Sequence, residues 1–309
     1  MTSETKPTDT NDHLVPQLNM RSKRRSDKLR TRENPVERFF EWLIVVVVLI
    51  ISIYPLLWLV QSSLKSETEI FLSPFVLPDT PDWANYEAAF NMGSTRATLA
   101  TFFRNSVLIA GCTVVLSVFI YSLGGYVVAR ESFRGKGVLI SLIALSLLLP
   151  RVALMFPLFL YSHLAGLYDT LLVLIVVYTG FQMPLAVFVL RSFFLTIPRS
   201  LEESAYMDGA TYWQAFVRIV LPLAQPALAT VAILVFIGSW NEFSFALLLT
   251  ASNQSRTIPV ALASFNSIYG SNIGAMFAGM VIVVAPAILI FVLFQKRIVS
   301  GLASGSIKQ

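Results

Sequence analysis

The chain is poor in the residues from which metal sites and covalent cross-links are built. Its 309 residues include one cysteine, Cys112, and two histidines, His13 and His163. A single cysteine excludes both a disulfide framework and a cysteine-based metal cluster. With only two histidines there is no metal-binding constellation, and we expect His163 to be an ordinary loop or interface residue. We therefore predict no metal site.

Charged residues are also scarce, and the chain has no phosphate-binding loop. Only 13% of the residues are charged and 55% are hydrophobic, so an ordinary soluble domain is excluded. The pattern G-x-x-x-x-G-K-[ST] does not occur, because Gly135-Lys136-Gly137 lacks the preceding glycine and the hydroxyl residue. Paired aspartates or a Ser/His pair in facing apolar segments, which an intramembrane hydrolase would need, are not visible. We expect no catalytic site and no cofactor in this chain.

Long apolar runs dominate the sequence instead. A helix that crosses a bilayer needs about 20 mostly apolar residues, because no water is present inside to satisfy its backbone. Six runs meet this requirement, at about Phe40–Ser62, Thr101–Ala129, Val138–Tyr161, Thr170–Arg191, Leu223–Leu249 and Ile273–Phe294. Several contain a proline that can kink a helix in a packed bundle, namely Pro55, Pro150, Pro157, Pro184 and Pro286. We predict an all-α membrane protein with six transmembrane helices over residues 40–294.

Lysine and arginine are distributed unevenly among the loops, and this asymmetry sets the orientation. One set of loops and termini carries Arg21, Lys23, Arg24, Arg25, Lys28, Arg30, Arg32, Arg38, Arg130, Arg134, Lys136, Arg199, Arg218, Lys296, Arg297 and Lys308. The opposite loops hold mainly Lys65, Arg96 and Arg256, with five acidic residues in the longest of them. We therefore expect both termini to be cytoplasmic. The net charge of +5 reflects membrane electrostatics rather than nucleic-acid binding, because the cations lie beside apolar runs.

The two ends of the chain differ in composition from the apolar middle. Residues 1 to about 33 are polar and charge-rich without an apolar period, which predicts a disordered arm. They lack the short apolar core of a cleavable signal peptide, so residues 1–39 are a cytoplasmic arm plus the start of the first helix. Residues 295–309 form a cytoplasmic tail that becomes small and flexible between Gly301 and Gly305.

The polar segment 199–222 separates two of the apolar runs and has helix signals of its own. Ser200 followed by Glu203 is a capping box, so we expect a helix to begin at Ser200. Gly209 interrupts this helix, and Thr211 can cap a second short one. Pro222 is well placed to open the next span.

The second short helix has an apolar edge, where Tyr212, Phe216 and Ile219 recur at helical spacing. The two helices together predict a bent, partly amphipathic hairpin at a membrane surface. From these residues alone, an ordinary interfacial connection between two spans remains a possible interpretation.

The hairpin resembles the signature loop of the membrane permeases of ABC importers. That loop has a Glu-Ala-Ala stretch, a glycine, an isoleucine and Leu-Pro, which match Glu203, Ala205, Gly209, Ile219, Leu221 and Pro222 with the same spacing. Ser204 departs from the preferred alanine but is also small.

The resemblance extends over most of the chain beyond the arm and narrows to carbohydrate importers. Matching strips are Asn105-Ser106, Phe133-Arg134-Gly135-Lys136, Pro157-Leu158, Gly166-Leu167-Tyr168-Asp169-Thr170, Leu190-Arg191-Ser192-Phe193-Phe194, Trp240-Asn241-Glu242-Phe243 and Gly301 to Lys308. The last two are similar to the subunit type of the second permease of the maltose system. A type I permease fold is implied.

This resemblance implies a transport subunit in the cell membrane of a prokaryote. Its partners would be a sister permease, two copies of an ATP-binding subunit and an extracytoplasmic solute-binding protein. ATP and Mg would be bound by the ATPase, whose closure would drive alternating access for a sugar or oligosaccharide. The implied ATPase-coupling residues are Glu203, Ser204, Ala205, Asp208, Gly209, Ile219, Leu221 and Pro222.

Individual roles within this loop follow from residue type. We expect Glu203 to make a polar contact with the ATPase, and Ala205 and Gly209 to permit close approach. Asp208, like Arg218, has the alternative interpretation of a solvated charge. The implied tail contacts with the ATPase are Gly301, Leu302, Gly305 and Lys308.

Polar residues inside the spans are candidates for the solute path, since charge is costly at the bilayer centre. Trp240, Asn241 and Glu242 could bind a sugar through an aromatic face, an amide and a carboxylate. Tyr178 and Gln182 are weaker candidates. A bundle-stabilising network explains Glu242 equally well, and in the maltose system the sister subunit supplies most sugar contacts. Arg151 is next to Pro150, and we expect it either to lie near a break in the helix or to pair with an acidic residue.

Two alternatives remain open at this point. The importer could carry a glycerol phosphodiester or a polyol, which this family also handles. A proton-coupled secondary carrier is the rival class, but it would need ionisable groups through several spans, and the chain offers mainly Glu242 and Arg151.

Overall fold

The computed structural model describes residues 35–91, 98–263 and 272–306, and every regular element in this part of the chain is a helix. The chain divides into two compact units, residues 1–58 and 59–309. The first unit is represented by most of α2 (Pro35–Ser62), and the second contains the other helices. The arm expected over residues 1 to 33 lies outside the described residues.

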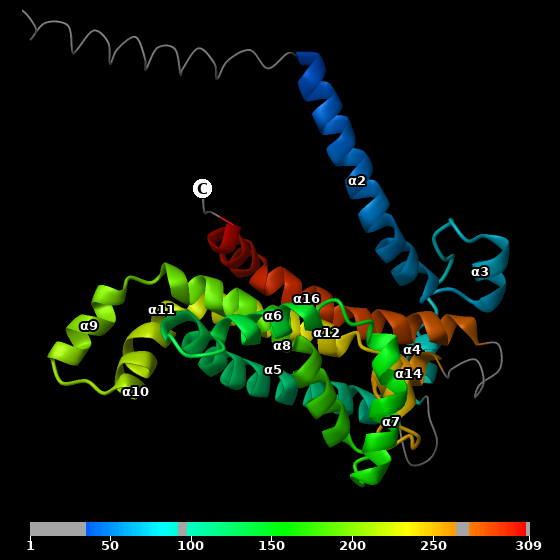
Figure 1. Ribbon diagram of the computed structural model, residues 1–309. Coiled ribbons are helices and arrows are strands. Elements are labelled where there is room, and N and C mark those ends of the chain that lie inside the picture. The colour runs from blue at the N-terminus through cyan, green and yellow to red at the C-terminus, as the bar shows by residue number, and fades with distance from the viewer. Residues whose placement is uncertain (1–34, 92–97, 264–271, 307–309) are drawn as a thin grey trace, which may run out of the picture. The chain divides into compact units, whose positions relative to one another are not determined.

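Figure 1 labels the main helices of the second unit. Their bounds are α3 (Glu67–Leu72), α4 (Ala84–Phe90), α5 (Leu99–Arg130), α6 (Lys136–Ser146), η1 (Arg151–Leu154), α7 (Met155–Leu164), α8 (Leu171–Thr196), α9 (Arg199–Met207), α10 (Tyr212–Ala215), η2 (Phe216–Val220), α11 (Leu221–Leu223), α12 (Gln225–Trp240), α13 (Ser244–Leu249), α14 (Ile258–Ala263) and α16 (Ile273–Ser306).

The number of possible membrane spans agrees with the sequence prediction. Among the described residues, four helices are long and apolar enough to cross a membrane: α2 from Arg38, α5, α8, and α16 as far as Leu293. Two further pairs pass the same test together but are bent at short breaks. Counting each bent pair as one span gives six, so the predicted all-α membrane fold is confirmed.

The third span is broken, whereas the sequence analysis predicted one helix from Val138 to Tyr161. Helix α6 and the η1–α7 segment meet at an angle of 99°. Pro150 lies in the break, where it lacks an amide donor and disfavours a helical conformation at the preceding residue. Pro150 was identified from sequence as a residue that can kink a helix, and a broken helix beside Arg151 was one of the two interpretations given there.

The fifth span is also shorter than the predicted Leu223–Leu249. Helix α12 begins at Gln225, with Pro226 in its first turn, and ends at Trp240, while α13 is separate. The segment Tyr212–Leu223 meets α12 at 75°, so the span opens at Gln225 rather than at Pro222. The prediction for Pro222 was therefore wrong in position, because a second proline four residues later, Pro226, lies in the first turn of α12.

The sixth span continues beyond its predicted end at Phe294. Helix α16 runs to Ser306, so the backbone from Gly301 to Ser306 is helical rather than an irregular tail. Lys308 lies outside the described residues, and the helix is described beyond residue 293 only through its backbone.

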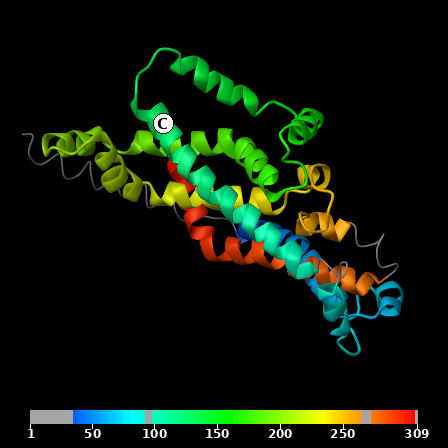
Figure 2. The same cartoon turned by 90° about the horizontal axis from the view of Figure 1, so that it is seen from below.

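The core of the second unit forms where α5, α8 and α12 lie side by side (Figures 1 and 2). Leu190 and Phe194 of α8 are fully buried against α5 and α12 residues, including Tyr126 and Val231. A Cβ atom added to Gly125 would lie only 3.1 Å from the Cβ atom of Leu190. Glycine at this point therefore lets α5 and α8 approach closely.

The Asn105-Ser106 pair holds the extended loop that follows α13. The Asn105 side-chain amide donates to the carbonyls of Gln254 at 2.7 Å and Arg256 at 3.0 Å. The Ser106 hydroxyl accepts from the Ile258 amide at 3.0 Å, at the start of α14. These bonds satisfy backbone groups of the loop that are not paired within a helix. The Asn105-Ser106 pair therefore has a structural role in holding this loop.

A buried lysine organises the α2–α3 connection. Lys65 is fully buried, and its ammonium group donates to the carbonyls of Ser73 at 2.8 Å and Pro74 at 3.2 Å. The Asn85 amide donates to the Lys65 carbonyl at 2.8 Å, and a Cβ atom on Gly274 would collide with this amide. Lys65 is thus a structural residue of this connection, in which its charge meets carbonyl oxygens rather than solvent.

Candidate functional site

The segment α9–α10 forms an elbow that projects from one end of the helical bundle of the second unit (Figures 1 and 2). Helix α9 ends at Met207, and Gly209 follows with φ of +84°, a left-handed conformation that favours glycine. The Ala210 amide donates to the Ala205 carbonyl at 2.9 Å and the Gly209 amide to the Tyr206 carbonyl at 3.0 Å. These two bonds make a Schellman motif, which fixes the bend.

The two arms of the elbow begin differently from one another. Helix α9 begins at Arg199 after Pro198, without a side-chain cap, so the predicted Ser200–Glu203 capping box is wrong. The Ser200 carbonyl instead accepts from the Ser204 hydroxyl at 2.8 Å, inside the helix. The cap predicted at Thr211 is confirmed, as a reciprocal box with Gln214.

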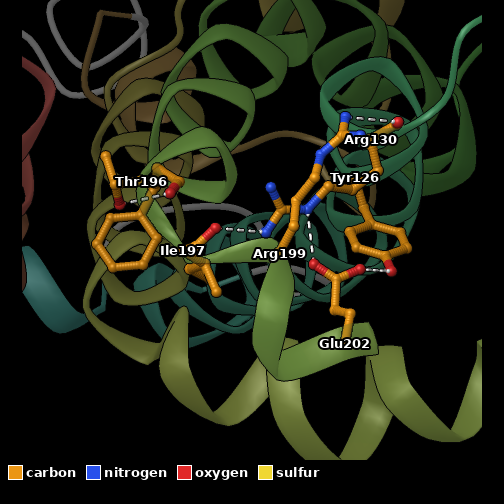
Figure 3. Close-up of polar contacts among 7 residues, drawn as sticks. Tyr126, Arg130, Thr196, Ile197, Arg199 and Glu202 are labelled. Carbon is orange, nitrogen blue, oxygen red and sulfur yellow. Dashed lines mark hydrogen bonds and ion pairs between the residues drawn. The ribbon is translucent and has the colours of Figure 1, made fainter. Parts of the chain in front are cut away.

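A buried ion pair fastens α9 to the end of α5 (Figure 3). The Arg130 Nε atom and the Glu202 Oε1 atom lie 2.7 Å apart, and the two side chains are 6% and 7% exposed. The Tyr126 hydroxyl donates to the other carboxylate oxygen of Glu202 at 2.6 Å. Charges are rarely buried unless they are paired, so Glu202 and Arg130 depend on one another for their position.

Two backbone contacts extend this anchor to α8 (Figure 3). The Arg130 guanidinium donates to the carbonyl of Ile197, the residue that follows α8, at 2.8 Å. Arg199, the first residue of α9, donates to the Arg130 carbonyl at 3.1 Å. The ends of α5 and α8 and the start of α9 are therefore linked through one arginine.

Aromatic packing fastens the second arm of the elbow to the same place. The Tyr126 ring lies 4.6 Å from Phe216, 5.3 Å from Tyr212 and 5.7 Å from Phe194, measured between ring centroids. Phe216 and Val220 are buried, whereas the predicted Ile219 is only half-buried. The π-helical turn Phe216–Val220 explains the difference, because its wider turn shifts the inward face by one residue.

The opposite side of the elbow is exposed. Glu203, Ser204, Asp208, Gly209 and Pro222 of the predicted coupling set are exposed; Leu221 is half-buried and Ala205 is buried. Met207 at the tip is 88% exposed. The elbow thus has an anchored inner side and a free outer side, and Ala205 belongs to the inner side rather than to a contact surface.

The sequence analysis missed Glu202, Arg130 and Tyr126. The sequence does contain a signal for Glu202. It precedes Ala205 by three residues, so Glu202 and Ala205 lie on the same face of the helix. Nothing local in the sequence pairs Glu202 with Arg130, which lies at the end of a different helix.

The residues proposed for the solute path lie partly together. The Tyr178 hydroxyl donates to Glu242 at 2.7 Å, and Glu242 also accepts from the amides of Phe245 at 3.0 Å and Ala246 at 3.1 Å. Glu242 therefore caps α13 and fixes this helix to α8. This agrees with the bundle-stabilising network that the sequence analysis gave as the alternative to a sugar contact. Gln182, one turn along α8 from Tyr178, packs against Gly238 of α12.

Trp240 does not lie beside Glu242 in an open site. Its ring is 2% exposed and stacks on Phe236, and its indole nitrogen donates to the Val283 carbonyl at 3.1 Å. Asn241 is exposed. In this conformation Trp240 is a core residue, whereas Asn241 is on the surface. The two side chains that were expected to bind a sugar together therefore do not share one site.

A second polar network ties the α7–α8 loop to the loop after α13. Asp169, at φ of +61°, accepts from the amides of Ala251 at 2.8 Å and Ser252 at 3.0 Å and from the Ser255 hydroxyl. Burial tends to raise the pKa of Asp169, but these hydrogen bonds outweigh it and hold the pKa below the ordinary 3.8. His163 was expected to be a loop or interface residue, but it lies in the last turn of α7, where it is exposed and stacks on Tyr168 of the following loop.

We predict that Asp169 makes the stability of this loop pair dependent on pH. A lowered folded-state pKa means that its stabilisation is present above about pH 3.8 and is lost as the pH falls through the folded value. Asp169→Asn keeps a residue tolerant of positive φ but removes the charge, and should lower the thermal midpoint at neutral pH. The difference from wild type should shrink as the pH falls below 3.8; a difference that stays the same at acidic and neutral pH contradicts this account.

Comparison with known proteins agrees with the described fold and elbow. Residues 121–304, which include the elbow, match the family described as "Binding-protein-dependent transport system inner membrane component". The chain belongs to this family. Its membrane helices therefore place it in the membrane as a multi-pass protein, and the resemblance stated from sequence is confirmed.

Relatives in this family are similar over most of their length. The trehalose transport system permease protein SugB of Mycobacterium tuberculosis is 39% identical, covering 83% of this chain and 93% of the relative. The probable ABC transporter permease protein YurM of Bacillus subtilis is 38% identical, covering 86% and 87%. The trehalose/maltose permease MalG of Thermococcus litoralis is 33% identical, covering 90% and 99%.

A solved structure supports the fold of the family member described here. A chain of a bacterial ABC transporter involved in the import of the acidic polysaccharide alginate has a TM-score of 0.73. It covers 86% of this chain and 98% of its own, at 24% sequence identity. The likeness shows the permease fold.

Proposed function

We propose that this chain is the transmembrane permease subunit of an ATP-driven ABC importer for a sugar or oligosaccharide. The observation that carries the proposal is the elbow. It has an exposed outer side, and it is fastened to the ends of α5 and α8 by Glu202, Arg130 and Tyr126. Membership of a binding-protein-dependent transport family and similarity to several sugar permeases support it.

The proposed complex contains a sister permease, two ATP-binding subunits and an extracytoplasmic solute-binding protein. ATP and Mg are bound by the ATPase, and this chain has no hydrolytic role of its own. The elbow and both termini are cytoplasmic, which the positive-inside rule supports, since Arg130 and Arg199 contact one another at the elbow and Arg134 and Lys136 follow in the loop after α5.

The mechanism is a mechanical linkage. ATP binding closes the two ATPase subunits, and the outer side of the elbow, with Glu203 and Asp208, moves with the subunit that it contacts. Because the inner side is fastened to α5 and α8, those helices move with it and the path changes from inward-facing to outward-facing. The linkage requires two discrete arrangements of the bundle that ATP binding biases.

The end of α16 supplies a second proposed contact with the ATPase. Its residues are Gly301, Leu302 and Gly305, followed by Lys308. The continuation of the helical backbone to Ser306 supports a defined approach to a partner, because a helix holds its direction better than an irregular tail.

A glycerol-linked or polyol solute is the second candidate class. The sulfoquinovosyl glycerol transport permease SmoH of Agrobacterium fabrum is 33% identical over 85% of this chain, which equals the identity to the trehalose/maltose permease. Sequence identity therefore does not choose between these solutes. A proton-coupled secondary carrier is the less favoured alternative, since Glu242 is engaged in capping α13.

The test of this function is uptake by the complete importer in proteoliposomes. We expect solute accumulation to require ATP and the binding protein, and to persist when a protonophore collapses the proton gradient. Uptake that stops with the protonophore but continues without ATP would identify a secondary carrier instead.

A further inference from the structure

A cleft lies where the broken third span faces α8. Its volume is 560 Å³, within the range of about 300–1,000 Å³ typical of small-molecule sites. Residues from both sides line it, including Ser146, Leu158, Tyr161, Phe181 and Met183, together with Arg151. Figure 2 shows α6 and α7 on one side of α8, and the two segments meet at the 99° bend.

Arg151 is the one residue among those that line the cleft whose side chain is charged at neutral pH. Its guanidinium carbon lies 5.6 Å from the centroid of the Phe181 ring, within the distance of a cation–π contact. The described residues place no carboxylate against it, and the rest of the lining is mainly apolar. The charge is therefore held in place by an aromatic face but not neutralised within this part of the chain.

The residues that line the cleft lie well inside the helices that contribute them. When α6 and the bent η1–α7 segment are counted as one span, α6 and α8 begin on opposite sides of that span. Ser146 is ten residues after Lys136, and Phe181 is ten after Leu171, so each lies about 15 Å along its helix from the start of that helix. A hydrocarbon core is about 30 Å thick, so in this topology the cleft lies within the membrane rather than at its surface.

A cation at this depth is rare unless it faces a water-filled path or a partner. The chemistry of the lining selects among ligands. A neutral sugar is usually bound through amides and carboxylates, which this cleft lacks, whereas a guanidinium fork matches a carboxylate, sulfonate or phosphate group. The Phe181 ring beside it offers an apolar surface to a sugar ring.

We propose that the cleft between η1–α7 and α8 is a solute site in which Arg151 binds an anionic group of an acidic saccharide. The proposal rests on the transport function above and adds the substrate class. Phe181 positions the guanidinium, and the break at Pro150 supplies the space. The Arg151 side chain would contribute selection within the membrane, after delivery by the binding protein.

The test is equilibrium binding to the complete importer in phosphatidylcholine nanodiscs. The probes are radiolabelled cellobiuronic acid and cellobiose, which differ in one carboxylate. We expect wild type to bind the acid about ten- to a hundredfold more tightly than the neutral sugar, as charge-assisted hydrogen bonds allow. Arg151→Gln should abolish the preference, Arg151→Lys should keep part of it, and Arg134→Gln, which removes an exposed arginine elsewhere, should retain it in full.

Several results would overturn the proposal. Equal or absent binding of both sugars by wild type, or an unchanged preference in Arg151→Gln, excludes an anion site. Loss of the sister permease from purified Arg151→Gln complexes would show that Arg151 pairs with an acid of that subunit. A co-purified anionic lipid that disappears in the variant, without any sugar preference in wild type, would assign the cleft to lipid. ATP-driven uptake, measured separately, tests the transport function itself.

Discussion

Gly209→Trp is expected to abolish ATP-driven uptake while the protein remains inserted in the membrane. Gly209 has φ of +84°, where a side chain costs about 1–2 kcal/mol, and its amide belongs to the motif that sets the bend of the elbow. A Cβ atom added at Gly209 would meet no neighbouring atom within 4 Å, so the effect comes from backbone strain and from bulk on the outer side. Uptake and ATP hydrolysis should be measured in the same proteoliposomes.

Gly135 offers a matched control for this prediction. It also has positive φ, +89°, and open space, but it lies in the α5–α6 loop rather than in the elbow. Gly135→Trp should strain the backbone similarly yet keep uptake coupled to hydrolysis. Gly209→Asn should be milder than Gly209→Trp, because asparagine tolerates the left-handed region. Normal uptake by Gly209→Trp with its ATPase bound would show that the elbow does not couple the two processes.

Glu202→Gln is expected to destabilise the protein strongly, whereas Glu203→Gln should not. Removing one partner of a buried ion pair costs about 3–5 kcal/mol, because it leaves Arg130 buried and uncompensated. Glu203 is exposed, and its substitution should change stability by about 0.5 kcal/mol or less while reducing ATPase coupling. Thermal unfolding of the purified complex and uptake per ATP hydrolysed separate the two effects.

The Arg130–Glu202 pair can be tested as a unit by a double-mutant cycle. Arg130→Met combined with Glu202→Gln should lose less stability than the sum of the two single changes, since the double variant leaves no unpaired charge. Additive losses would mean that the two side chains act independently. A thermal midpoint for Glu202→Gln equal to that of wild type would refute the anchoring role itself.

Local sequence patterns predicted the elbow and the number of spans correctly, but they failed where tertiary contacts decide. The Thr211 cap and the bend at Gly209 depend on a few neighbouring residues, and both were identified. The start of α9 was placed one residue too late, since Ser200 and Glu203 had a capping pattern that the helix does not use. The core position of Trp240 also depends on a distant helix, because the Val283 carbonyl of α16 accepts the hydrogen bond from its indole nitrogen.

The sequence by itself determined that this protein is an all-helical membrane protein with the signature elbow of the permease family, because span length and motif spacing are local properties. Only the tertiary structure decided which glutamate faces inward, where the third span breaks, and that Arg151 lies over Phe181. Such facts join residues far apart in sequence, whose approach depends on how the helices pack. Hydrophobicity specifies that a helix is buried in a membrane, but the packing of its neighbours selects the partners of its polar groups.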